Sequence, residues 1–182
     1  MLQVTIPSVE LYDEDNNEFI TIEGQTLTLE HSLASLSQWE SKWCKPFLSK
    51  EKMTEEESID YIRCMTLTPN VRPEVYAIIP NSVIETVSEY IAKPMTATWF
   101  SDNGKKSKKR SNEQVTAEII YYWMIALNIP PEYEFWHLNK LLTLVRVCDE
   151  KNKPPKKRSN NSILNEYAAL NNARRQRLNS KG

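Results

Sequence analysis

Apolar and polar residues alternate along the first thirty positions, with apolar side chains two apart at Val4 and Ile6. After an Asp- and Asn-rich segment, 13–17, the apolar run Phe19–Ile22 follows. Period two with β-branched residues is typical of β-strands, and clustered Asp and Asn residues favour a turn. Residues 1–30 are therefore predicted to form an antiparallel hairpin or a three-stranded meander. A lone hairpin is marginally stable in water, so we expect it to pack on the helices that follow.

From Ser32 the apolar spacing lengthens to three or four residues, which is typical of amphipathic helices. Ser32 is a natural N-cap for the first of them. Thr54 followed by Glu57 has the spacing of a capping box and predicts the start of another. Both features predict where helices begin before any tertiary contact is considered.

The segment 115–127 is apolar on nearly every side. A helix of that kind is usually buried, so we predict that it forms the centre of a bundle and begins at an N-cap at Ser111. A long helix is predicted from Pro131 to about Asp149, since proline suits the first turn of a helix. The segment Met95–Phe100 alternates and is rich in threonine and aromatic residues, which predicts a strand.

These elements predict a mainly α (α+β) fold, with an N-terminal β-hairpin or meander packed on about five to six helices. Residues 1–150 are expected to form one globular domain, comprising the hairpin 1–30 and a helical body, 31–150. Within that body we expect a mobile loop at 101–111, which is basic and polar. Residues 151–182 are expected to form a basic linker and a C-terminal helical tail.

Charge is divided unevenly along the 182 residues, although the formal net charge is only −1. Residues 1–100 hold 7 Lys+Arg and 16 Asp+Glu, a net charge of −9. Residues 101–182 hold 16 Lys+Arg and 8 Asp+Glu, a net charge of +8. Basic segments could bind an acidic protein surface, including that of another copy, or nucleic acid, or could simply be solvated. The candidate partner-binding residues are the basic clusters and one aromatic side chain: Lys105, Lys106, Lys108, Lys109, Arg110, Lys156, Lys157, Arg158, Arg174, Arg175, Arg177 and Trp99.

Few residues in the sequence suggest a catalytic, metal-binding or cofactor-binding site. Three glycines leave little room for phosphate-binding loops, and three widely spaced cysteines do not match a disulfide framework or a zinc site. His31 and His137 are interpreted as structural residues, and Glu118 as the one acid that is partly buried. An enzyme would need a cleft joining Glu118, His137 and Tyr121 or Tyr122. We expect no catalytic site, no metal site and no cofactor.

The N-terminal segment becomes acidic within fifteen residues and does not resemble a signal peptide. The most apolar window, 119–127, is far shorter than the ~20 residues needed to cross a bilayer. We therefore expect a soluble, intracellular protein without a membrane partner.

Five segments resemble a family of small proteins from long-tailed bacteriophages that are described as tail assembly chaperone-like. The resemblance covers almost the whole chain and is carried by Leu29–Trp43, Thr116–Met124, Trp136–Leu142, Ala168–Asn171 and the Arg174–Arg175 pair. No catalytic motif accompanies it.

The resemblance implies a virion morphogenesis role, with the phage tape measure and tail tube proteins as partners, in the host cell cytoplasm or also in the virion. It also implies self-association, because opposite charges at the two ends allow head-to-tail contacts that build rings or filaments. The apolar surface for a client helix is expected on the Trp39/Trp43 or the Tyr121/Tyr122 face. The alternative is a nucleic-acid-binding accessory protein or a minor structural virion protein.

Overall fold

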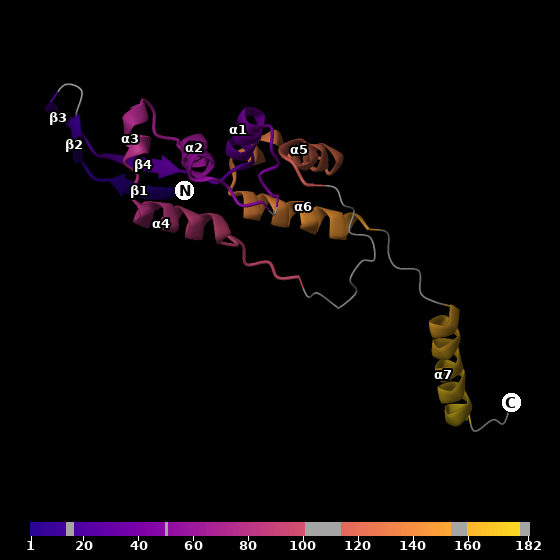
Figure 1. The fold of residues 1–182 in the computed structure, drawn as a ribbon. Helices are drawn as coiled ribbons and strands as arrows, with labels where there is room; N and C mark the ends of the chain where they lie inside the picture. Colours follow the sequence, from indigo (N-terminus) through magenta and orange to yellow (C-terminus); the bar gives the residue numbers. More distant parts are fainter. Residues whose placement is uncertain (14–16, 50, 101–113, 154–159, 179–182) are drawn as a thin grey trace. The chain divides into compact units, whose positions relative to one another are not determined.

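The computed structural model describes all residues except 14–16, 50, 101–113, 154–159 and 179–182 (Figure 1). It divides into two compact units, Met1–Asp149 and Glu150–Gly182. The described residues contain seven α-helices and an N-terminal antiparallel β-hairpin region, which confirms the predicted mainly α, α+β fold class.

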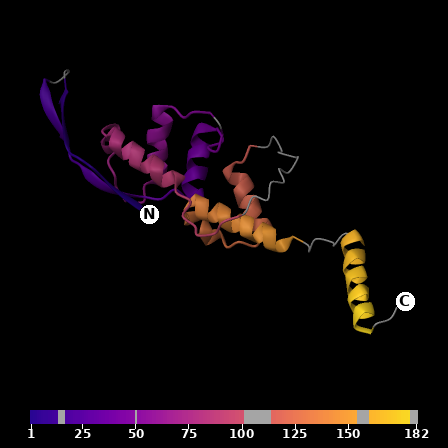
Figure 2. The same cartoon turned by 90° about the horizontal axis from the view of Figure 1, so that it is seen from below.

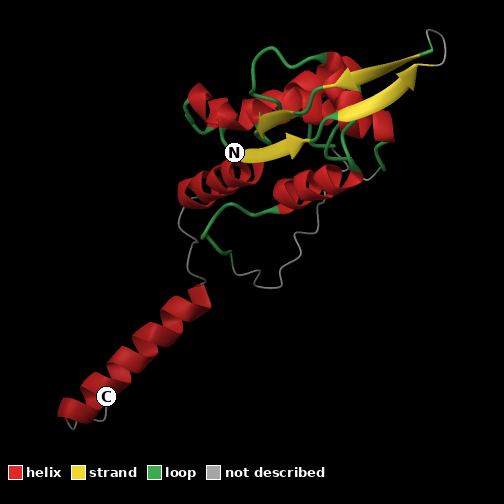
Figure 3. Ribbon diagram, turned by 90° about the vertical axis from the view of Figure 1, so that its left-hand side faces the viewer, coloured by secondary structure: helices red, strands yellow, loops and turns green. Residues whose placement is uncertain are grey.

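The hairpin consists of two successive antiparallel strand pairs (Figure 3). β1 pairs with β4, and β2 pairs with β3. Between the two pairs the Gly24 N–H donates to Ser8 Oγ at 2.9 Å, and a Cβ added to Gly24 would lie only 2.3 Å from the carbonyl oxygen of Ile6. Glycine is thus required at this close approach of the two backbones. The strands are β1 (Leu2–Ile6), β2 (Val9–Asp13), β3 (Glu18–Ile22) and β4 (Gln25–Leu29).

Only the β1–β4 half of the hairpin packs on the helices as predicted. Val4, Ile6, Leu27 and Leu29 are buried in the first of two apolar clusters. The β2–β3 half is the upper-left end of the indigo ribbon in Figure 2. Its side chains Leu11, Tyr12, Phe19 and Ile20 are exposed. The expectation that the whole hairpin packs on the body is therefore wrong for β2 and β3.

The first cluster lies between the β1–β4 pair and four helices, one face of each being apolar. Trp39 and Met65 lie at its centre, and the backbone of Glu30 continues the strand pairing by donating to the Met65 carbonyl at 2.9 Å. The capping box predicted at Thr54 and Glu57 is present, as is the N-cap at Ser32. The helices are α1 (Leu33–Trp43), α2 (Glu55–Met65), α3 (Pro73–Ala77) and α4 (Asn81–Ala92).

The second cluster lies on the other side of α1, where Leu33 and Leu36 meet α5 (Ala117–Ala126) and α6 (Leu138–Asn152). Because α1 contributes to both clusters, it is the helix around which the first unit is organised. The prediction that the most apolar helix, α5, is central is wrong.

α5 is peripheral because only Ala117, Ile120 and Met124 face inward, whereas Tyr122 is exposed and Ile125 is 75% exposed. Its start is also later than predicted, since Gln114–Thr116 are not helical. The predicted N-cap, Ser111, lies outside the described residues, as does the expected mobile loop 101–111.

The helix predicted from Pro131 to Asp149 is two elements. A 3₁₀ turn, η1 (Pro131–Phe135), is followed by Trp136 in extended conformation, and only then does α6 begin. The break occurs because the chain pairs with the start of α1: Ser32 and His137 form an isolated β-bridge, and the Leu138 N–H donates to the His31 carbonyl at 2.7 Å.

The strand predicted at Met95–Phe100 is absent, since these described residues form no regular element. Met95 has φ 49°, in the left-handed region, which interrupts extended backbone at the first residue. Trp99 is 90% exposed, so this aromatic residue lies on the surface.

The second unit contains α7 (Asn160–Leu178), in agreement with the predicted C-terminal helix. Every described side chain of α7, from Leu164 onward, is exposed. The helix therefore has no core of its own within the described residues of this unit.

Candidate interaction surfaces

Two histidines lie buried where the two apolar clusters meet. His31, between β4 and α1, is 2% exposed, and His137, just before α6, is 4% exposed; their ring centroids are 5.1 Å apart. His31 Nδ1 lies 2.6 Å from the Tyr61 hydroxyl, and His137 Nε2 lies 3.2 Å from the Tyr90 carbonyl oxygen. The Tyr90 hydroxyl in turn donates to the buried carboxylate of Glu30 at 2.8 Å. The histidines thus join strand β4 to helices α2, α4 and α6.

Burial lowers the pKa of both imidazoles because it penalises the charged form. For His31, burial and then the neighbouring His137 lower the pKa to about 3. Both rings are neutral near pH 7 and hydrogen-bonded within the protein. This arrangement agrees with their interpretation as structural residues.

The structure does not assemble the constellation that an enzyme was expected to need. Glu118 is exposed, not partly buried, because it lies on the outer side of the peripheral helix α5. Tyr121 donates to Glu134 at 2.6 Å, and Tyr122 is exposed. His137 lies instead beside His31 and the Tyr90 carbonyl oxygen.

Among the described residues, the buried carboxylates instead lie directly after β4, on α1 and on α2, and they are Glu30, Glu40, Glu57 and Asp60. Glu40 on α1 is 8% exposed and accepts two backbone hydrogen bonds, from Phe47 N and from Ala117 N, each 2.7 Å long. Ala117 is the first residue of α5, and its N-cap, Thr116, makes no side-chain capping bond. Glu40 therefore caps a helix that lies 77 residues away in the sequence. Its place one residue after Trp39, on the inward side of α1, is the only sequence feature that suggests burial.

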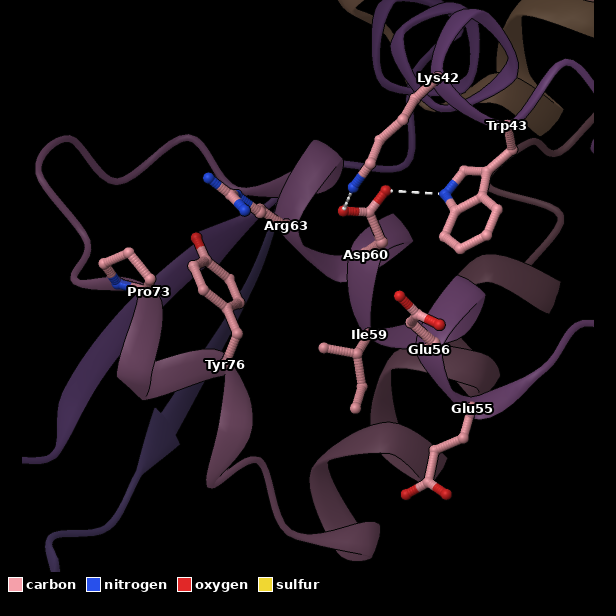
Figure 4. Close-up of a pocket in the computed structure, with 9 residues that line it drawn as sticks. All are labelled: Lys42, Trp43, Glu55, Glu56, Ile59, Asp60, Arg63, Pro73 and Tyr76. Carbon is pink, nitrogen blue, oxygen red and sulfur yellow. Dashed lines mark hydrogen bonds and ion pairs between the residues drawn. The ribbon is translucent and has the colours of Figure 1, made fainter.

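A groove of about 590 Å³ lies between α1, α2 and α3 (Figure 4). Asp60 is at its centre, where Lys42 and Trp43 Nε1 both donate to its carboxylate, the latter at 2.9 Å. Burial opposes ionisation of Asp60, but the hydrogen bonds from Lys42 and Trp43 outweigh it, so the pKa is below its usual value. The lining residues are Lys42, Trp43, Glu55, Glu56, Ile59, Asp60, Arg63, Pro73 and Tyr76.

The groove offers both charge and aromatic surface. Glu55 and Glu56 are exposed in the first turn of α2, where the helix dipole favours acids. Arg63 lies with its guanidinium carbon 6.0 Å from the ring centroid of Tyr76. Such a groove can hold a peptide by ion pairs and aromatic contact. Across the described parts of the chain, no three His, Cys, Asp or Glu side chains are arranged to bind a metal ion.

A second, mainly apolar groove of about 480 Å³ lies between α5 and α6. Neither Tyr121 nor Tyr122, the face predicted for a client, lines this groove, and Trp39 is buried and unavailable to a client. Its lining residues are Trp123, Ala126, Leu127, Leu142, Val145, Arg146 and Asp149.

A third surface is the β2–β3 half of the hairpin, which the sequence prediction did not identify. Leu11 lies opposite Ile20, and Tyr12 lies opposite Phe19, so apolar residues occupy both faces. All four are exposed, and Phe19 is 74% exposed. The alternation of apolar and polar residues indicates strands here, but it cannot show that both faces of the strand pair stay exposed to solvent.

The predicted partner-binding residues fall into two groups. Trp99 and three arginines on α7, Arg174, Arg175 and Arg177, are described and exposed. On α7 the arginines share the surface with exposed apolar residues. The remaining predicted residues lie outside the described part of the chain: Lys105, Lys106, Lys108, Lys109, Arg110, Lys156, Lys157 and Arg158.

In the described residues, no helix is both long enough and apolar enough to cross a membrane. Comparison of the chain with protein-family models, curated proteins and solved structures finds no significant match.

Proposed function

We propose that this chain is an assembly factor of a long-tailed bacteriophage that works by protein–protein contact in the host cytoplasm. Its partners are the tape measure and tail tube proteins and further copies of itself. The observation that carries the interaction role is the set of large apolar side chains left exposed on the hairpin, on α5 and on α7. The tail assembly role is supported by the sequence resemblance alone.

Exposed apolar surface of this kind marks interaction sites. Single exposed hydrophobic residues are common, but contiguous patches are not. The groove between α5 and α6 is lined mostly by apolar side chains, among them Trp123, Leu127 and Leu142. An amphipathic client helix fits such a groove by laying its apolar face into it. We assign this groove to the tape measure protein, which the resemblance implies as a long, aggregation-prone client that needs protection before the tail forms.

Co-purification tests this assignment. The tagged chain, co-expressed with the tape measure or tail tube protein of the same genome, is expected to retain at least one of them. Ala126 lines the groove and is exposed, so Ala126→Glu places a charge in it and is expected to reduce capture of the tape measure protein about tenfold. Leu67→Glu is the matched control, because Leu67 is also exposed but lies after α2. A monomeric chain that captures neither protein contradicts the proposal.

Nucleic-acid binding is the alternative role for the basic segments. The described arginines, Arg174, Arg175 and Arg177, share α7 with Tyr167 and several exposed leucines, a mixture that suits a protein partner. A DNA-binding role predicts affinity that falls steeply as salt rises. Absence of a gel shift at low salt removes this alternative.

A further inference from the structure

The β2–β3 pair, Val9–Asp13 with Glu18–Ile22, is a projecting arm with apolar residues on both faces, and we call it the acidic arm. A two-stranded ribbon is marginally stable in water, and its exposed edges and apolar side chains favour pairing with another element. Tyr12 and Phe19 contact each other across the strands, with ring centroids 5.1 Å apart, and both remain exposed. The arm therefore presents apolar surface that only a partner can bury.

The charge of the arm restricts the partner. No lysine or arginine precedes Lys42, whereas eight acidic residues do. Glu10 and Glu18 are exposed on the arm itself. A partner must therefore offer apolar side chains together with positive charge.

α7 has this combination. Tyr167, Leu170, Arg174 and Leu178 follow one another at spacings of three, four and four residues, so they share one side of the helix. All four are exposed, and Arg175 and Arg177 add further positive charge beside them. Residues 151–182 contain nine Lys+Arg and one Glu, a net of +8. Like the arm, α7 lacks an apolar partner within the described residues of its own unit.

We propose that α7 of one copy docks along the acidic arm of a second copy, with the apolar side of the helix against the arm and its arginines beside Glu10 and Glu18. Each copy then keeps one free arm and one free helix for the next copy. Contacts of this head-to-tail kind build rings or filaments. The inference rests on the proposed assembly role, for which it supplies the mode of self-association.

Charge reversal on each side tests the docking by sedimentation velocity of the full chain at low ionic strength. The wild type is expected to form oligomers that dissociate as salt screens the charges. Glu10→Lys/Glu18→Lys reverses the charge at the two arm positions proposed to face the arginines, and Arg174→Glu/Arg175→Glu reverses it at two positions of α7. Each is expected to self-associate at least about tenfold more weakly. An equimolar mixture of the two is expected to recover the oligomers, because the substituted positions of the arm and of α7 then carry opposite charges again.

Glu55→Lys/Glu56→Lys is the matched control. It makes the same change of charge in the groove between α1 and α2 and is expected to leave the oligomers intact. Circular dichroism of each variant establishes that the fold is retained. The inference is overturned by a monomeric wild type, by arm and helix variants that associate as the wild type does, by a mixture that stays monomeric, or by loss of association in the control. Capture of the tape measure protein is scored separately with the same variants, so failure of the docking is distinguished from failure of the assembly role.

Discussion

Replacement of Glu40 by alanine tests whether the two apolar clusters are held together by this side chain. Glu40 is 8% exposed, and its two carboxylate oxygens accept from Phe47 N and Ala117 N at 2.7 Å. Alanine removes both acceptors and leaves two backbone N–H groups without them. One of these groups begins α5, whose N-cap residue makes no side-chain capping bond.

The expected loss follows from these two hydrogen bonds. A hydrogen bond to a charged group contributes about 1.5–3 kcal/mol, so two of them give about 3–6 kcal/mol. Water that enters the vacated space recovers part of this, and the folded state no longer bears the cost of burying a carboxylate. We therefore expect Glu40→Ala to lower the free energy of unfolding by about 3 kcal/mol. Glu40→Gln keeps one acceptor oxygen and is expected to cost about half as much.

Urea denaturation measures this loss, with tryptophan fluorescence as the probe, since Trp39 is buried beside Glu40. Glu89→Ala is the control, because Glu89 is exposed on α4 and its loss is expected to change stability by less than about 0.5 kcal/mol. Amide hydrogen exchange adds a local readout, in which the start of α5 loses protection in Glu40→Ala. A variant that unfolds within about 0.5 kcal/mol of the wild type refutes the capping role.

Three further predictions concern stability. Gly24→Ala is expected to lower the melting temperature, because its Cβ would lie 2.3 Å from the Ile6 carbonyl oxygen; thermal denaturation checks it. Burial, and then His137, lower the pKa of His31 from 6.5 to about 3, so the unfolded chain binds a proton that the folded chain does not. The contribution of neutral His31 to the free energy of unfolding is therefore fully present above about pH 6.5. It is lost as pH falls towards 3, by at most ~1.4 kcal/mol per pH unit. Urea midpoints for His31→Asn are expected to vary less over this pH range. Cys44 ends α1 at φ 51°, a conformation that glycine adopts without strain, so Cys44→Gly is expected to stabilise the chain by about 0.5–1 kcal/mol in the same denaturation assay.

Local signals in the sequence predicted local structure well. Ser32 and the Thr54–Glu57 pair are side chains whose capping bonds reach only three residues, so their effect does not depend on the rest of the fold. The alternation in residues 1–30 predicted the strands for the same reason. The C-terminal helix was also predicted from its own residues.

Features that depend on distant contacts were missed. Apolar residues around α5 indicate a helix, but they cannot show that α1 takes the central place and leaves Ile125 exposed. The hydrogen bond from Ala117 to Glu40 joins residues 77 apart, and no local pattern marks it. The break before α6 depends in the same way on the pairing of His137 with Ser32.

The candidate interaction surfaces likewise divide into those that local sequence predicts and those that depend on distant contacts. Exposure of Arg174, Arg175 and Arg177 follows from a helix with little apolar surface. The arm was missed because alternation of apolar residues, as at Leu11 and Ile20, is normally a sign of one buried face. Only the structure distinguishes the strand pair that packs on helices from the one that does not.

The most direct test of the proposed assembly role is the solubility of the tape measure protein when it is produced with and without this chain. We predict that co-expression moves most of the tape measure protein from the pellet to the soluble fraction, in a complex with this chain. Ala126→Glu is expected to return it to the pellet, whereas Leu67→Glu is not. A tape measure protein that remains equally insoluble with the wild-type chain would contradict the chaperone role.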